Sequence, residues 1–283
     1  RRSQGKVIWE MDPVALKFGK LEVRWYGVFA ALGFAVAYCL VRLRARTREF
    51  QADAIDQLVF WILVGGIGGA RAMYVATHWS EFQNQWNRAF AVWEGGLVFY
   101  GGFIGAFAAA YIVAVVKKMP KRSLADLVAP ALPLGHAFGR VGCFLNGCCY
   151  GQPYDGPFAL QYPAQHYPHV AATQQHIGHL SVAIQECLPV FPVQLLNSAT
   201  NLLIFVVLLL VEPRMPRKGQ LFALYLMLYS TFRFSTEFLR GDYLHRTAGL
   251  TPAQFLCLIL LPIGIIAFVL LGKSTESQEG SGQ

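Results

Sequence analysis

The sequence carries little charge. Only 14% of its 283 residues are charged, whereas 55% are hydrophobic, and the mean hydropathy is +0.40. Soluble globular domains have about 25% charged residues, so this composition excludes an ordinary soluble domain. The formal net charge of +8 does not indicate nucleic acid, because the basic residues are not gathered on a polar domain with interleaved aromatic residues.

Long polar stretches are scarce as well, and apolar stretches recur along the chain. Several approach the ~20 residues that cross a bilayer as a helix. They lie at residues 25–41, 57–77, 95–116, 124–146, 193–212, 219–239 and 253–272. We therefore predict an all-α polytopic membrane protein with about seven transmembrane helices.

Lys and Arg are absent from residues 151–190 but follow the first, third and fifth spans. Cytoplasmic loops are the ones enriched in Lys and Arg, which predicts an outer N-terminus and a cytoplasmic C-terminus. The predicted division is an outer segment at 1–24, spans 1–4 in 25–150, a small outward-facing (periplasmic) head with short β-like pieces at 151–190, spans 5–7 in 191–272, and a disordered cytoplasmic tail at 273–283.

Glycines four residues apart recur in and beside the predicted spans. The pairs are Gly65 with Gly69, Gly101 with Gly105, Gly135 with Gly139, and Gly147 with Gly151. This small-xxx-small spacing lets helices approach closely. We expect these glycines to make a compact bundle around whatever polar groups lie inside it.

Charged residues inside the spans are few and mostly basic. Arg71, Arg140, Arg233 and Glu237 lie within predicted spans, and Arg240 follows the sixth span. Facing lipid would cost about 2.5–3.5 kcal/mol per charge, so we expect them to face the bundle interior. Arg233 and Glu237 can pair on one helix face, whereas the surplus arginines favour an anion, and guanidinium suits the phosphate of a phospholipid.

Six motifs together resemble the bacterial prolipoprotein diacylglyceryl transferases. They are VRWYG (23–27), GGARAMYV (68–75), GGLVFYGGFIGA (95–106), DLVAPALPLGHAFGRVGCFLNG (126–147), FPVQLL (191–196) and YSTFRFSTEFLR (229–240). The resemblance implies a seven-span fold in the bacterial inner (cytoplasmic) membrane. It also implies transfer of the diacylglyceryl group of phosphatidylglycerol to the lipobox cysteine of preprolipoproteins, with release of glycerol 1-phosphate.

The resemblance also assigns roles to residues. Arg140 and Arg233 match the two essential arginines, and Tyr26 and Tyr229 match functional tyrosines. As candidate bases we add His136, one helical turn before Arg140, and Tyr100. The predicted phosphatidylglycerol-binding residues are Arg140, Arg233, Arg71, Asn146, Gly142, Gly151, Glu237 and Arg240. We expect no cofactor and no metal.

The chain departs from the family pattern at four positions. Tyr100 stands where some members have His, Cys143 and Cys148 stand where Asn and Glu are common, and Asn197 stands in place of Glu. These changes remove a candidate base and two carboxylates. Two other readings therefore stay open: a phosphatidylglycerol-using transferase with another acceptor, and a lipid or anion transporter, although no internal repeat favours the latter.

Cysteines and histidines on the predicted outer side allow further sites. Cys148 or Cys149 could form a disulfide with Cys187, and we expect a structural role for these cysteines. The head also has two H-x-x-H pairs, at His166 and His169 and at His176 and His179. No acidic or cysteine pattern accompanies them, so we interpret them as loop polarity rather than as a zinc site.

Overall fold

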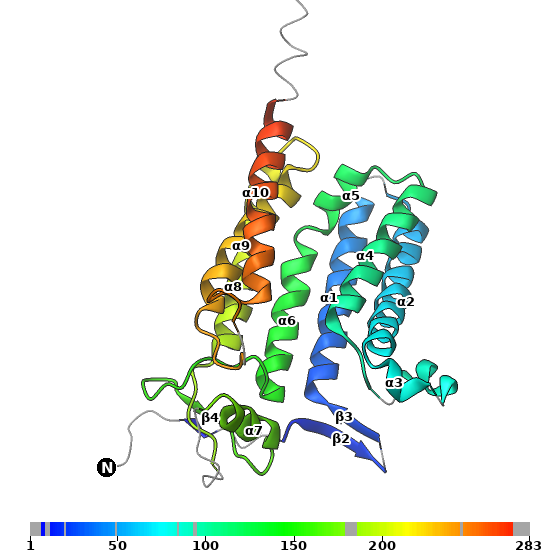
Figure 1. Cartoon of the computed structure of the whole chain (residues 1–283). Helices are drawn as coiled ribbons and strands as arrows, with labels where there is room; N and C mark the ends of the chain where they lie inside the picture. The colour runs from blue at the N-terminus through cyan, green and yellow to red at the C-terminus, as the bar shows by residue number, and fades with distance from the viewer. Residues whose placement is uncertain are drawn as a thin grey trace, which may run out of the picture. The chain divides into compact units, whose positions relative to one another are not determined.

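The computed structural model describes residues 7–8, 12–19, 21–48, 50–83, 85–92, 95–178, 186–243 and 246–273 (Figure 1). The chain divides into two compact units. The first contains residues 1–37 and 128–283, and the second contains residues 38–127. The predicted tail, apart from Lys273, lies outside the described residues.

Five long helices are long and apolar enough to cross a bilayer. This confirms the prediction of a mostly helical, multi-pass membrane protein. The helices are α1 (Trp25–Arg46), α2 (Ala52–Thr77), α4 (Phe99–Val116), α8 (Val193–Val211), which continues into the 3-10 turn η3 (Glu212–Arg214), and α10 (Pro252–Lys273).

The other two predicted spans differ from the remaining five. Residues 124–146 form two helices, α5 (Lys121–Val128) and α6 (Ala131–Asn146), because Pro130 sits at the start of α6, where its missing N–H does least harm. With 16 residues, α6 is shorter than the ~20 that cross a bilayer. The helix α9 (Gln220–Glu237) has 18 residues but carries Ser, Thr, Arg and Glu. The count of seven spans therefore stays a prediction.

In the second unit, glycines bring α2 and α4 together, and the two helices run side by side (Figure 1). A Cβ atom on Gly65 would lie 2.6 Å from the carbonyl oxygen of Gly105, and a Cβ atom on Gly69 would lie 2.9 Å from the Cα of Gly105. A Cβ on Gly101 would in turn meet the carbonyl oxygen of Gly69. Two of the four predicted glycine pairs thus make one close helix contact. The short helices α3 (Trp79–Phe82) and η1 (Trp86–Phe90) follow α2.

In the first unit, α6 packs on α8, α8 on α9, and α9 on α10 (Figure 1). Gly33 of α1 lies against α6, since a Cβ there would be 2.7 Å from the carbonyl oxygen of Gly135. Gly139, the other member of that predicted pair, has nothing within 4 Å of a built Cβ. Gly33 and Gly135 therefore let α1 and α6 approach each other closely.

A small folded part follows α6 and contains the helix α7 (Pro168–His176) (Figure 1). Here β1 (Val7–Ile8) pairs in parallel with β4 (Leu160–Gln161). The part has its own apolar cluster, centred on the fully buried Tyr162 and Tyr167. Their hydroxyls donate to the carbonyls of Phe144 and Leu145 at 3.0 Å, which ties the part to the last turn of α6.

The label all-α is incomplete because the described chain also has a β-hairpin. The strands β2 (Val14–Phe18) and β3 (Leu21–Arg24) pair antiparallel, directly before α1. Gly19, at φ 60°, provides the left-handed turn between them. The predicted outer segment at 1–24 therefore contains a hairpin directly before α1.

The contact between α2 and α4 predicts unequal effects of substituting two adjacent glycines. In Gly69→Ala the new Cβ meets backbone of α4, which cannot yield as a flexible side chain would. We expect a loss of about 1–3 kcal/mol of unfolding free energy, measured as a lower Tm of the detergent-solubilised protein. Gly68→Ala is the control, because its Cβ has nothing within 4 Å. Equal Tm values for the two variants would contradict the contact.

Candidate functional site

One face of α6 carries three polar residues. His136, Arg140 and Cys143 are four and then three residues apart, so they lie above one another on the helix. The Nε of Arg140 donates a 3.0 Å hydrogen bond to Nε2 of His136. Since that ring nitrogen accepts, the imidazole is neutral with its proton on Nδ1. The ring of Tyr229, on α9, lies 5.7 Å from the His136 ring.

A buried carboxylate organises the end of α9. Glu237 has no exposed surface, and its Oε2 lies 2.7 Å from Nη1 of Arg233. Its other oxygen, Oε1, lies 3.5 Å from Nη1 of Arg240 and accepts a hydrogen bond of 3.1 Å from the hydroxyl of Thr251. Glu237 therefore holds two guanidinium groups, so the predicted pairing of Arg233 with Glu237 is present.

Arg240 is held by a second carboxylate as well. Its Nε and Nη2 donate to the two oxygens of Asp242 at 3.0 and 2.9 Å, a bidentate fork. Its guanidinium also lies 4.4 Å from the ring centre of Tyr243, and burial raises the pKa of that phenol to about 12. Arg240, Tyr243 and Arg246 line a pocket of about 350 Å³.

The charges of this region do not balance. Arg140, Arg233, Arg240 and Arg246 provide four cations, and Glu237 and Asp242 provide two anions. Among the described residues no carboxylate pairs with Arg140. Arg140 and Arg233 both act electrostatically on His136. The region around His136 and Tyr229 therefore has a positive surplus that suits an anion.

The signature residues lie where the backbone makes close contacts; they are Gly142, Gly151 and Asn146. A Cβ on Gly142 would lie 3.3 Å from the Cα of Tyr26, so α6 touches the first turn of α1 there, and Tyr26 itself is 46% exposed. A Cβ on Gly151 would lie 2.5 Å from the carbonyl oxygen of Phe191. The carbonyl of Asn146, the last residue of α6, is 2.9 Å from Nε2 of His169.

Arg71 and Tyr100 belong to the second unit. Arg71 is buried, and its guanidinium donates to main-chain carbonyls: Nε to Ala89 at 2.9 Å, Nη1 to Gly95 at 2.6 Å, and Nη2 to Arg88. In the described conformation it therefore holds the loop between α2 and α4. Tyr100, in the first turn of α4, is 53% exposed. Their predicted roles toward substrate stay predictions.

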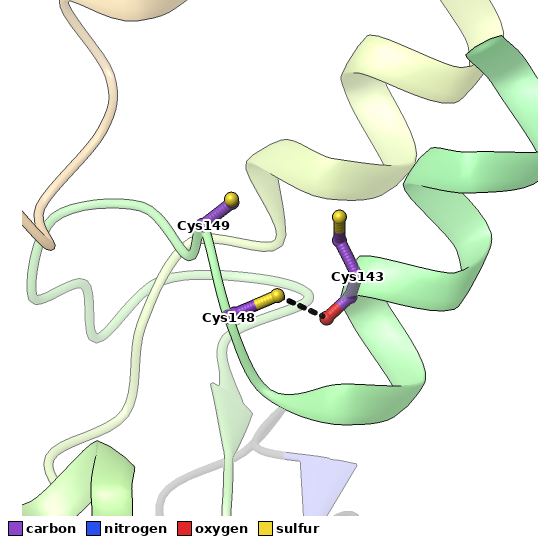
Figure 2. Close-up of side chains that lie close together, drawn as sticks. All are labelled: Cys143, Cys148 and Cys149. Atoms are coloured by element: carbon purple, nitrogen blue, oxygen red, sulfur yellow. Dashed lines mark hydrogen bonds between the residues drawn. The ribbon is translucent and has the colours of Figure 1, made fainter. Parts of the chain in front are cut away.

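The cysteines are arranged otherwise than we expected from the sequence. All six are free, so neither Cys148 nor Cys149 is bonded to Cys187. Cys187 instead belongs to the apolar cluster around Tyr162 and Tyr167, where burial raises its pKa to about 11. Sequence spacing did not reveal that Cys143, Cys148 and Cys149 share one location, shown in Figure 2.

The histidine pairs form no metal-binding group among the described residues. His169 contacts the end of α6, and His179 lies outside the described residues. Sequence reasoning also missed Tyr243 and Thr251, the hydroxyl partners of Arg240 and Glu237. For Tyr243 the sequence offered a signal, because this residue lies close to charged residues in the chain. Thr251 offered no such signal, because it comes from the loop before α10.

Comparisons with known proteins agree on one family. A family model described as prolipoprotein diacylglyceryl transferase matches residues 13–270. A phosphatidylglycerol--prolipoprotein diacylglyceryl transferase of Trichormus variabilis is 33% identical over 260 residues, which covers 89% of this chain and 87% of that protein. The enzyme of the same name from Listeria monocytogenes is 33% identical over 265 residues, with 93% and 92% covered.

The paired cations predict that loss of the Glu237 carboxylate strongly destabilises the fold. In Glu237→Gln two neighbouring guanidiniums lose their shared counter-ion, and breaking a buried pair in this way costs about 3–5 kcal/mol. We expect a much lower Tm in detergent. The control is Glu22→Gln, because the ion pairs of Glu22 with Lys17 and Arg24 are exposed and contribute at most about 1 kcal/mol. A Glu237→Gln protein with the wild-type Tm would refute the assignment.

Proposed function

Because the chain belongs to the prolipoprotein diacylglyceryl transferase family, it is a membrane-embedded transferase, and we propose that Arg140 and Arg233 bind the phosphate of its lipid substrate. The reaction is the transfer of the diacylglyceryl group of phosphatidylglycerol to a prolipoprotein, the first step of lipoprotein lipidation. The acceptor is the thiol of the lipobox cysteine, and glycerol 1-phosphate leaves.

One observation carries this proposal for the site. Arg140 has no carboxylate partner within the described part of the chain, and its one hydrogen bond goes to a neutral imidazole. A guanidinium next to apolar spans is costly without a counter-ion. The phosphodiester of the lipid supplies that counter-ion, and Arg233 lies close enough for both charges to act on the same histidine, His136.

The chemistry requires stabilisation of a leaving phosphate. The acceptor sulfur attacks the glycerol carbon, the carbon–oxygen bond to phosphorus breaks, and its electron pair stays on the phosphate oxygen. Cations that are already in place when this charge develops lower the barrier. Arg140 and Arg233 are held before substrate arrives, Arg140 by His136 and Arg233 by Glu237.

The remaining predicted residues receive supporting roles. His136 orients Arg140, because its accepting nitrogen is already occupied by that arginine. Tyr229 lies beside His136, and Tyr26 lies where α1 meets Gly142. The positions of these residues support contact with the substrates. Asn146, Gly151 and Arg240 hold the backbone and the network around the site, and Arg71 orders its own loop.

The predicted topology completes the proposal. The chain crosses the bacterial inner membrane about seven times, with α6 and α9 as the two shorter or more polar spans. The N-terminus and the part at 151–190 face outward, and the C-terminus is cytoplasmic. The absence of Lys and Arg from 151–190 supports this orientation.

Transfer of labelled diacylglyceryl from phosphatidylglycerol to a lipobox peptide tests the arginines. We expect Arg140→Ala and Arg233→Ala each to reduce kcat by about 10²–10³, the usual cost of one group that stabilises charge in the transition state. Arg214→Ala is the matched control, because Arg214 is exposed and its Nη1 binds the carbonyl of Leu210. Full activity in both site variants would overturn the phosphate assignment. No transfer by folded wild type would indicate another acceptor.

A further inference from the structure

Three cysteine sulfurs lie together at the end of α6. The Sγ atoms of Cys143, Cys148 and Cys149 are all within 4.8 Å of one another, and Figure 2 shows the three side chains around one space. The thiol of Cys148 has a long contact of 3.7 Å with the carbonyl of Cys143. The phosphate chemistry proposed above gives none of these thiols a role.

The backbone brings the three residues to one place. Gly147 ends α6 in the left-handed conformation at φ 67°, and the N–H of Cys148 bonds back to the carbonyl of Cys143 at 3.1 Å. Cys149 is itself left-handed, at φ 58°, which is unusual for a residue with a side chain. The side chain of Gln194 on α8 fixes the turn by donating to the carbonyl of Cys148 at 2.9 Å.

Two arginines lie near this cluster. Arg140 lies three residues before Cys143 on the same face of α6, and the charges of Arg140 and Arg240 both act on Cys149. Thiolates are the ligands that soft d¹⁰ metal ions select, whereas Mg²⁺ and Ca²⁺ prefer oxygen.

We infer that Cys143, Cys148 and Cys149 bind one Zn²⁺ ion and leave its fourth position open to the acceptor thiol. Sulfurs around one zinc, at about 2.3 Å from the metal, are about 3.8 Å apart, so small side-chain rotations close the cluster. No fourth His, Cys, Asp or Glu of the described residues joins the group. Structural zinc sites are closed by four protein ligands, whereas three ligands and an open position mark a reactive site.

The role of the open position rests on the proposed function. The acceptor cysteine binds Zn²⁺ and loses its thiol proton to water, because a coordinated thiol is deprotonated. Its thiolate then attacks the glycerol carbon of phosphatidylglycerol, a carbon–sulfur bond forms, and the carbon–oxygen bond to phosphate breaks. Glycerol 1-phosphate leaves with the electron pair, and the thioether, a weaker ligand, dissociates. Nothing is oxidised or reduced, and no protein base is needed.

Metal content tests the site without reference to activity. The full chain, purified in detergent and dialysed with Zn²⁺, is expected to hold about one zinc by elemental analysis. Cys143→Ser and Cys149→Ser should bind zinc at least about tenfold more weakly. Cys39→Ser is the control, because Cys39 is exposed and outside the cluster. The elution volume and Tm of each variant verify that it is folded.

Cobalt gives an independent reading on the wild type. Co²⁺ in the site should produce sulfur-to-metal charge-transfer absorption in the near ultraviolet and visible bands of a tetrahedral ion. A lipobox peptide added without phosphatidylglycerol should shift those bands, and the same peptide with Ser in place of Cys should not. The site would be overturned if the purified protein bound no metal. It would also be overturned if the mass of the protein were two units below the expected value, because two of the three cysteines would then form a disulfide.

The two proposals fail in different ways. If the protein transfers diacylglyceryl at the wild-type rate in both serine variants and without zinc, the metal inference is wrong and the transferase assignment stands. If zinc binds with a thiolate spectrum and the peptide shifts it, but no lipid is transferred, the site stands and the proposed reaction is wrong. If the cobalt absorption bands do not change when the cysteine peptide is added, the acceptor thiol does not bind at the fourth position of the metal.

Discussion

Glu237 is the group on which the arrangement of the site depends. It is fully buried, lies 2.7 Å from Arg233 and 3.5 Å from Arg240, and takes a third contact from Thr251. Two guanidiniums this close would repel strongly in a medium of low dielectric constant. Buried ion pairs add little net stability, so the main effect of Glu237 is to position two cations. Arg140, on α6, then remains as the cation without a carboxylate partner among the described residues.

The sequence predicted those parts of the fold that depend on local patterns. Gly65, Gly69, Gly101 and Gly105 were predicted from spacing alone, because a contact between helix backbones needs a small residue once per turn. The stretch expected as one span at 124–146 forms two helices, because an average of hydropathy does not detect the break at Pro130. The hairpin before α1 was not predicted, since strands of four and five residues leave little periodicity to detect.

For the site, sequence reasoning succeeded where one helix carries the geometry. The helical period places His136, Arg140 and Cys143 on one face, and the hydrogen bond between the first two is present. It could not foresee that Arg71 donates to carbonyls at Ala89 and Gly95, because those carbonyls converge only once the loop has folded. These partner carbonyls lie in irregular backbone, where no periodic sequence pattern predicts their positions.

The cysteine cluster was hidden for the same reason. Spacings of five residues and of one residue do not match the usual zinc-binding patterns. The sulfurs meet because Gly147 and Cys149 turn the chain back through left-handed conformations, and only the first of these is a glycine. A sequence pattern shows where such a turn is easy, but not where a cysteine adopts it.

Charge connects the cluster to the family pattern from which it departs. The positions of Cys143 and Cys148 commonly hold Asn and Glu, so the pattern places one negative charge beside Arg140. Three neutral thiols would remove that charge and leave the arginines with a larger surplus. The two positive charges of Zn²⁺ and the three negative charges of the thiolates sum to one negative charge, the same as in the family pattern. The inferred zinc centre therefore keeps the charge of the carboxylate lost at Cys148, and its open position activates the acceptor thiol in place of the candidate base lost at Tyr100.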